Sequence, residues 1–241
     1  HIPVLGLGAL QQPAAIEQAL AEGKADVIAM ARASIADPHF PEKARHGRAE
    51  DIVPCLRCLD CLTGLHAGNQ LTCAVNCRTA QEARFDRMSA PAKSSRKVLV
   101  VGGGPGGMKA AVTAAQRGHN VTLAEQTDKL GGLLKFTDYD DLKVDLMWLK
   151  NYLIRQVEKH NVNVLLNTTV TPELVAEEAP DALLLAVGSN PIVPRLPGID
   201  GDNVIIVNDY YLKKDQVQDT VVVLGGDYVA SPVTRTFQIT K

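Results

Sequence analysis

Short runs of apolar residues, separated by stretches with helical spacing, form the main pattern of this sequence. A helix of about 14 residues is expected after 101, ending near Gly118, and a second helix is expected over 142–154. Strands that alternate with helices predict a parallel α/β sheet, and runs with little polar alternation are typical of strands buried on both faces. Runs of strand length lie at 2–5, 98–101, 120–124, 181–188 and 220–224.

Composition and charge exclude several classes of protein. The chain has 241 residues, with 25 Lys+Arg against 27 Asp+Glu and a net charge of −2. Without a basic block, nucleic acid is not an expected partner. No apolar run is long enough for a membrane span, and the first residues do not resemble a signal peptide, so a cytoplasmic protein is expected. Because the chain starts at His1 inside an apolar run and stops shortly after the run at 220–224, we expect a part of a longer protein.

The cysteines carry the sharpest chemical signal. All 5 lie in one segment, with the spacing C-x2-C-x2-C-x11-C followed by C-x3-C. An odd number without secretory features argues against a disulfide framework. Three closely spaced thiolates and one remote thiolate suit a [4Fe–4S] cluster, whereas structural zinc more often uses two separated C-x2-C pairs. The predicted ligands are Cys55, Cys58, Cys61 and Cys73, with Cys77 as the spare, although spacing also permits Cys77 as the fourth ligand and zinc as the metal.

A glycine motif predicts a dinucleotide site. Gly102, Gly104 and Gly107 fit G-x-G-x-x-G between a strand and a helix. The first glycine allows the tight turn, the second lets a pyrophosphate approach, and the third lets the helix pack on the strand. The next strand ends in Glu125, where an acid that binds ribose hydroxyls belongs. Such an acid favours FAD or NAD over a 2′-phosphorylated nucleotide, and the later segments 130–133 and 186–188 favour FAD.

In combination, these motifs resemble those of the iron–sulfur flavoproteins related to old yellow enzyme. That family includes 2,4-dienoyl-CoA reductase, enoate reductases and trimethylamine dehydrogenase. It usually has Pro where this chain has Cys77, which supports Cys77 as a non-ligand. The segments that carry the resemblance are Met30-Ala31-Arg32, 36–38, 52–58, 73–76, the glycine motif at 102–107, Glu125, 131–132 and 186–188.

The resemblance implies an architecture for the whole chain. Residues 1–50 would be the end of an FMN-binding (β/α)8 barrel, with the eighth strand at 26–30 and the preceding helix including 17–22. The other implied parts are a [4Fe–4S] segment and linker at 51–92, a Rossmann-like FAD-binding domain at 93–216, and the start of a second, NAD-type nucleotide-binding lobe at 217–241.

The resemblance also implies residues that bind cofactors. Gly8, Ala31 and Arg32 take the places that hold the FMN phosphate, and catalytic residues are expected in the rest of the barrel. In the second lobe, Asp227 replaces a glycine that a pyrophosphate would need, so nicotinamide binding there is expected to be weak. The expected FAD contacts are Gly102, Gly104, Pro105, Gly107, Glu125, Gly132, Val170, Ala186 and Gly188.

The activity implied by the resemblance is electron transfer from NAD(P)H through FAD and the cluster to FMN, which reduces an activated C=C bond of an enoate or enoyl thioester. The helix at 142–154 is closer to the enoate-reductase branch. One alternative is an amine dehydrogenase or demethylase that passes electrons to an acceptor protein. Another is a non-enzymatic nucleotide-binding module with structural zinc. A small-molecule substrate is the expected partner, and a homo-oligomer is compatible with each hypothesis.

Overall fold

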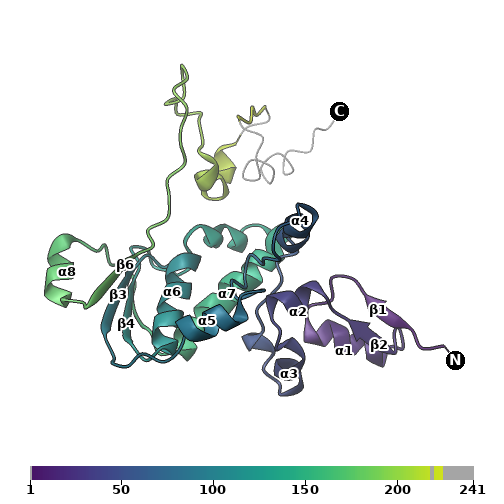
Figure 1. Ribbon diagram of the computed structural model, residues 1–241. Helices are drawn as coiled ribbons and strands as arrows, with labels where there is room; N and C mark the ends of the chain where they lie inside the picture. The colour runs from purple at the N-terminus through teal and green to yellow at the C-terminus, as the bar shows by residue number, and fades with distance from the viewer. Residues whose placement is uncertain (1, 218–219, 225–241) are drawn as a thin grey trace. The chain divides into compact units, whose positions relative to one another are not determined.

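The computed structural model describes residues 2–217 and 220–224, and the chain divides into two units, His1–Gly188 and Ser189–Lys241. The first unit contains two parallel sheets (Figure 1). The mixed α/β organisation expected from the sequence is therefore confirmed. Within the described ranges, every helix is too short or too polar to cross a membrane.

The N-terminal part is a strand–helix–strand segment. Strand β1 (Leu5–Leu7) pairs in parallel with β2 (Val27–Ala29), and helix α1 (Pro13–Ala21) connects them. The predicted strand at 2–5 therefore begins later than expected, at its last residue. A small core forms beneath this pair from Ile16, Ala33, Phe40 and Ile52. The following elements are α2 (Arg32–Ala36), α3 (Phe40–Arg45) and the short 3-10 helix η1 (Ala49–Asp51).

A segment with little regular structure joins the two sheets. It contains helices α4 (Asp60–His66) and α5 (Glu82–Met88). All 5 cysteines lie between Ile52 and α5, in α4 and in the loops on either side of it.

The larger sheet has four parallel strands in the order β5-β4-β3-β6. Helices α6 and α7 pack on each other, and α6 packs on the strands, around a core that includes Val100, Met108, Leu123 and Val157, all fully buried. The bounds are β3 (Lys97–Val101), α6 (Pro105–Gln116), β4 (Asn120–Ala124), η2 (Gly132–Asp138), η3 (Asp141–Lys143), α7 (Val144–Lys159), β5 (Asn163–Leu165), α8 (Pro172–Glu178) and β6 (Ala182–Leu185).

The strands expected at 98–101 and 120–124 are confirmed, and so is the helix after the glycine motif. The helix expected at 142–154 is present but is displaced and longer, as α7. Strand β5 was not expected. It contributes only three residues to the sheet, too few to show a period.

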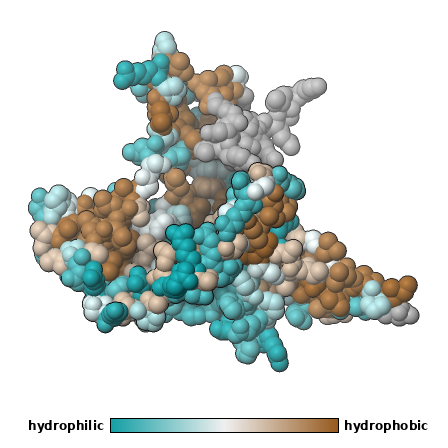
Figure 2. Space-filling model, viewed as in Figure 1, coloured by the Kyte–Doolittle hydropathy of each residue, from teal (hydrophilic) through white to brown (hydrophobic). Residues whose placement is uncertain are grey.

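Two strand predictions were wrong in part. Strand β6 exists, but it lies at the edge of the described sheet, where Leu185 is 71% exposed. Figure 2 shows apolar side chains gathered at the surface around this strand, and again around β1 and β2. Residues 220–224 form no strand, and Val222 is 82% exposed. A strand needs a neighbour to pair its backbone groups, and these residues pair with none of the described strands.

The second unit, taken by itself, contains two 3-10 helices, η4 (Val207–Leu212) and η5 (Lys214–Gln216). Tyr210 is buried, and its ring meets that of Tyr211 edge to face at a centroid distance of 5.2 Å. The predicted second glycine turn at Gly225-Gly226-Asp227, and the helix after it, lie outside the described residues.

Candidate cluster and dinucleotide sites

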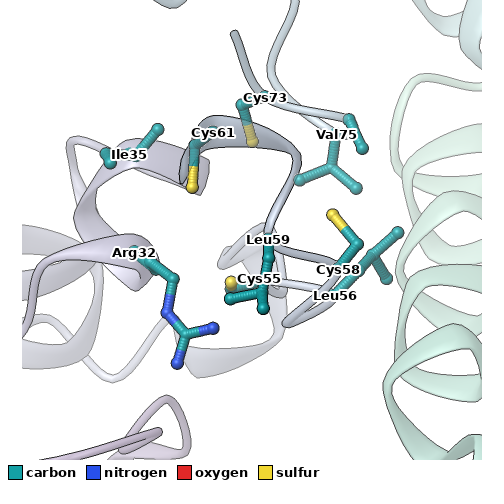
Figure 3. A pocket seen from close by; sticks show the side chains of 10 residues that line it. Arg32, Ile35, Cys55, Leu56, Cys58, Leu59, Cys61, Cys73 and Val75 are labelled. Carbon is teal, nitrogen blue, oxygen red and sulfur yellow. The ribbon is translucent and has the colours of Figure 1, made fainter. Parts of the chain in front are cut away.

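The structure brings the four predicted ligand cysteines into one hollow of about 300 Å³, counting the space at its mouth (Figure 3). Their side chains surround a common space. Cys77 does not line this hollow and is exposed. The lining residues are Arg32, Ile35, Cys55, Leu56, Cys58, Leu59, Cys61, Cys73, Ala74 and Val75.

The loop before α4 has an unusual backbone. Arg57 and Leu59, on either side of Cys58, have φ angles of 52° and 64°. This left-handed region costs a residue with a side chain about 1–2 kcal/mol. The turned backbone directs the Arg57 amide to Cys55, where it donates a hydrogen bond to Sγ at 3.4 Å. Strain of this kind persists where surrounding contacts hold it, and it is frequent at functional sites.

The hollow combines apolar walls with positive charge. Burial raises the pKa of the Cys55 thiol, while the hydrogen bond from the Arg57 amide and the charge of Arg32 oppose that rise. Within residues 2–217 and 220–224, Arg32 has no carboxylate partner. Its guanidinium lies on the side of the hollow occupied by Cys55 (Figure 3). Arg32 was expected only at the FMN phosphate, and its place in the cysteine wall was missed.

The donor set around the hollow consists of four cysteine thiols. In the described ranges, no three His, Cys, Asp or Glu side chains converge on a point that one metal ion could occupy. Zinc would need four sulfurs at about 2.3 Å from one centre. A cubane binds each thiolate through a different iron, so its ligands stand further apart. Four thiols around one hollow are a donor set that an iron–sulfur cluster can use.

Asp145, in the first turn of α7, links two other segments of the unit. One is the loop before α4 that carries Cys55 and Cys58, here called the cysteine loop, and the other is the segment after β1. Asp145 Oδ2 accepts a hydrogen bond from Arg57 Nε at 2.7 Å, and its Oδ1 accepts one from Gln11 Nε2 at 2.9 Å. The Asp145 hydrogen bond raises the pKa of Arg57. The partners are 88 and 134 residues away in sequence, and sequence reasoning missed them because no local pattern links them.

The glycine motif forms the expected turn between β3 and α6. Gly102 has a φ of 107°, and a Cβ there would lie 2.3 Å from the carbonyl oxygen of Ala186. A Cβ on Gly107 would lie 1.8 Å from the oxygen of Gly102. Helix α6 begins at Pro105, with Gly104 as the residue before its first turn. The geometry therefore requires glycine at the first and third motif positions, and it leaves the N-terminus of α6 facing the turn.

Glu125, at the end of β4, holds this turn from the side. It is 7% exposed, and its Oε2 accepts the Gly103 amide at 2.7 Å. Its Oε1 accepts the amide of Thr127 at 3.0 Å and the Thr127 hydroxyl at 2.7 Å. Burial tends to raise the pKa of Glu125, but hydrogen bonds from Thr127 and Gly103 outweigh it and lower the pKa. The roles of Gly103 and Thr127 were not expected, because neither belongs to the motif.

The remaining expected contacts lie around the same edge of the sheet. A Cβ on Gly132, where φ is 53°, would lie 2.8 Å from Gly104 Cα, so these two segments cross closely. Ala186 and Gly188 follow β6, and Val170 is half-buried in the loop between β5 and α8. The structure thus brings the turn, Glu125, Gly132 and Ala186 to the carboxyl edge of the larger sheet, where ligands of open α/β sheets bind.

The three residues expected at the FMN phosphate lie at the carboxyl ends of the smaller sheet. Gly8 follows β1 with a φ of 116°, Ala31 precedes α2, and Arg32 is the first residue of α2. Phosphate is held at this end of the strands in (β/α)8 barrels.

A parallel sheet with a glycine turn and a carboxylate on the next strand defines a dinucleotide-binding protein. Residues 64–179 and 96–239 match the family described as pyridine nucleotide-disulphide oxidoreductase, and residues 1–51 match the NADH:flavin oxidoreductase / NADH oxidase family. The chain belongs to the pyridine nucleotide-disulphide oxidoreductase family, joined to an NADH:flavin oxidoreductase segment as in the iron–sulfur flavoproteins related to old yellow enzyme.

Individual relatives agree with this assignment. An NADH oxidase from Thermoanaerobacter brockii is 37% identical, over 95% of this chain and 36% of its own length. A 2-naphthoyl-CoA reductase solved with 2-naphthoyl-CoA matches with a TM-score of 0.90 and 37% identity, over 95% of this chain and 35% of that one. Histamine dehydrogenase from Rhizobium sp. 4-9 matches with a TM-score of 0.74 and 31% identity, over 80% of this chain and 29% of that one. The chain spans about a third of the length of these relatives.

Proposed function

We propose that this chain belongs to a flavin- and [4Fe–4S]-dependent oxidoreductase that uses NAD(P)H to reduce an activated C=C bond of an enoate or enoyl thioester. The observation that carries the proposal is the four-cysteine hollow, which lies in one unit with the glycine turn and is lined by Arg32 from the barrel-like segment. The similarity to an NADH oxidase and to a reductase of an aromatic CoA thioester supports the electron donor and the substrate class.

Each cofactor has a set of residues suited to it. Cys55, Cys58, Cys61 and Cys73 would hold the cluster, and Cys77 would not. Gly102, Gly104 and Gly107 with the N-terminus of α6 would hold the FAD pyrophosphate. When bound, the flavins and the cluster supply the electron-transfer chemistry.

The two flavins would contact side chains of different charge, FAD a carboxylate and FMN a guanidinium. The Glu125 carboxylate would accept the ribose hydroxyls of the FAD adenosine, since it has lone pairs beyond those used by Gly103 and Thr127. Arg32, with backbone amides near Gly8 and Ala31, would bind the FMN phosphate. Apolar side chains of Ile35, Leu56 and Val75 would exclude water from the cluster. Cysteine thiolates that bind a cluster would suit a reducing compartment such as the cytoplasm.

Chemical analysis and one reaction test this proposal. The complete protein, purified anaerobically, is expected to contain iron, sulfide, FMN and FAD, and to oxidise NADH faster when an enoate or enoyl thioester is present. Zinc without iron or sulfide would favour the nucleotide-binding module with structural zinc instead. An intact set of cofactors that never accepts electrons from NADH or NADPH would refute the reductase.

An amine dehydrogenase or demethylase is the second candidate. The similarity to histamine dehydrogenase favours it, and so does Asp227, whose carboxylate in the second glycine motif would repel a pyrophosphate. Such an enzyme would be bleached anaerobically by a methylated amine and would pass its electrons to an acceptor protein. Bleaching by NADH and not by amines would exclude this alternative.

A further inference from the structure

A pair of opposite charges is connected to Cys55 through the backbone of Arg57. The Arg57 amide donates to Cys55 Sγ at 3.4 Å, and the side chain of the same residue donates through Nε to Asp145 Oδ2 at 2.7 Å. Asp145 belongs to α7 in the dinucleotide-binding part, and its side chain is only 16% exposed. One residue therefore connects a predicted ligand sulfur with a mostly buried carboxylate.

The carboxylate is held in place from a second direction. Gln11, which is itself buried, donates from Nε2 to Asp145 Oδ1 at 2.9 Å. Both oxygens of Asp145 thus have a donor, one from the cysteine loop and one from the segment after β1. Two anchors fix the position of the negative charge relative to Cys55 more firmly than a single exposed ion pair would.

Charges at fixed positions near an iron–sulfur cluster change its reduction potential. Reduction adds one negative charge to the cluster, so a nearby cation stabilises the reduced form and a nearby anion destabilises it. We infer that Arg57 and Asp145 are positioning residues that set the reduction potential of the cluster through their opposed charges. This inference rests on the proposed function, because it requires a cluster in the hollow.

The two charges predict shifts of opposite sign. Asp145→Asn keeps the shape and an acceptor oxygen for Arg57 but leaves the guanidinium uncompensated, so the potential should rise. Arg57→Gly keeps the amide that donates to Cys55, and glycine adopts the left-handed φ of 52° without strain. This variant leaves Asp145 uncompensated, so the potential should fall. For each variant we expect roughly a tenfold change in the equilibrium constant for one-electron reduction, equivalent to 59 mV.

The experiment is a redox titration of the complete holoprotein, followed by the electron paramagnetic resonance signal of the reduced cluster. Iron and sulfide are measured first in each preparation. Asp86→Asn is the matched control, because Asp86 is largely exposed and pairs with Arg78, which adjoins Cys77 and not a predicted ligand. The control should keep the wild-type potential, and the double variant of Arg57 and Asp145 should return close to it.

The outcomes separate this inference from the proposed function. Opposite shifts in the two single variants support it. Intact clusters whose potentials shift in the same direction in both variants, or shift no more than in the Asp86 control, would overturn this inference but not the proposed function. Loss of the cluster in Arg57→Gly would have the same consequence. Should Arg57→Gly not fold, the sign in Asp145→Asn decides, and a potential that stays or falls refutes the inference. A wild-type protein without iron and sulfide would overturn the proposed function as well.

Discussion

The substitution Glu125→Gln tests the glycine turn with almost no change of shape. The carboxylate accepts the Gly103 amide through Oε2, and the amide and hydroxyl of Thr127 through Oε1. Gln offers one oxygen and one NH2 donor in their place. At least one of the two backbone amides must then face a donor and lose its acceptor.

The expected cost follows from these contacts. A hydrogen bond to a charged group contributes about 1.5–3 kcal/mol, and Glu125 is 7% exposed, so water replaces the lost acceptor poorly. We expect the free energy of unfolding at pH 7 to fall by about 1.5–3 kcal/mol. FAD should bind more weakly as well. The iron and FMN contents should remain unchanged, because Glu125 follows β4 of the larger sheet and does not line the cysteine hollow.

The difference in unfolding free energy between wild type and Glu125→Gln should also depend on pH in a definite direction. Burial raises the pKa of Glu125, but the hydrogen bonds outweigh it and place the pKa below its ordinary value of 4.5. A carboxylate with a lowered pKa in the folded state stabilises the fold above the unfolded value and loses that contribution as the pH falls through the folded value. The difference in unfolding free energy between wild type and Glu125→Gln should therefore be full at pH 7 and shrink below about pH 4.5.

Urea unfolding between pH 3 and 7 measures this difference. Glu158→Gln, an exposed position in α7, is the control and should stay within about 0.5 kcal/mol of wild type. A difference for Glu125→Gln that is the same at every pH, or no larger than that of the control, would refute the role given to the carboxylate. Equal loss of FAD, FMN and iron would indicate misfolding in place of a local effect.

Three further predictions concern the other groups of the proposed sites. Cys73→Ser should abolish the visible absorption of the cluster while Cys77→Ser retains it, and the reverse result would exchange their roles. Gly107→Ala should lose FAD and at least about 1–3 kcal/mol of stability, because its Cβ would lie 1.8 Å from the oxygen of Gly102; normal FAD content would contradict the tight packing. Arg32→Gln should release FMN while iron content stays constant, and retained FMN would remove Arg32 from the phosphate site.

The sequence predicted the central part of the larger sheet because its signals are local. A strand, a glycine turn and a helix follow one another from 97 to 116, and the first and third glycines of the motif have a steric reason at Ala186 and within the turn. The exposure of β6 could not be predicted, since an apolar run shows that a strand can be buried but not which neighbours cover it. The same limit explains 220–224, whose apolar residues find no pairing partner in the described part of the chain.

The cysteine spacing predicts the kind of cofactor more readily than its reactivity. Four sulfurs around one hollow come from residues close together in the chain, so the spacing indicated the segment, and the family resemblance favoured Cys73 over Cys77. The charges beside Cys55 come from elsewhere: Arg32 from the start of α2, and Asp145 from a helix 88 residues after its partner Arg57. The reduction potential of a cluster depends on nearby charges and hydrogen bonds as well as on the cluster type. Two chains with the same cysteine spacing can therefore hold the same type of cluster at different reduction potentials. The positions of charges in the folded chain account for that difference.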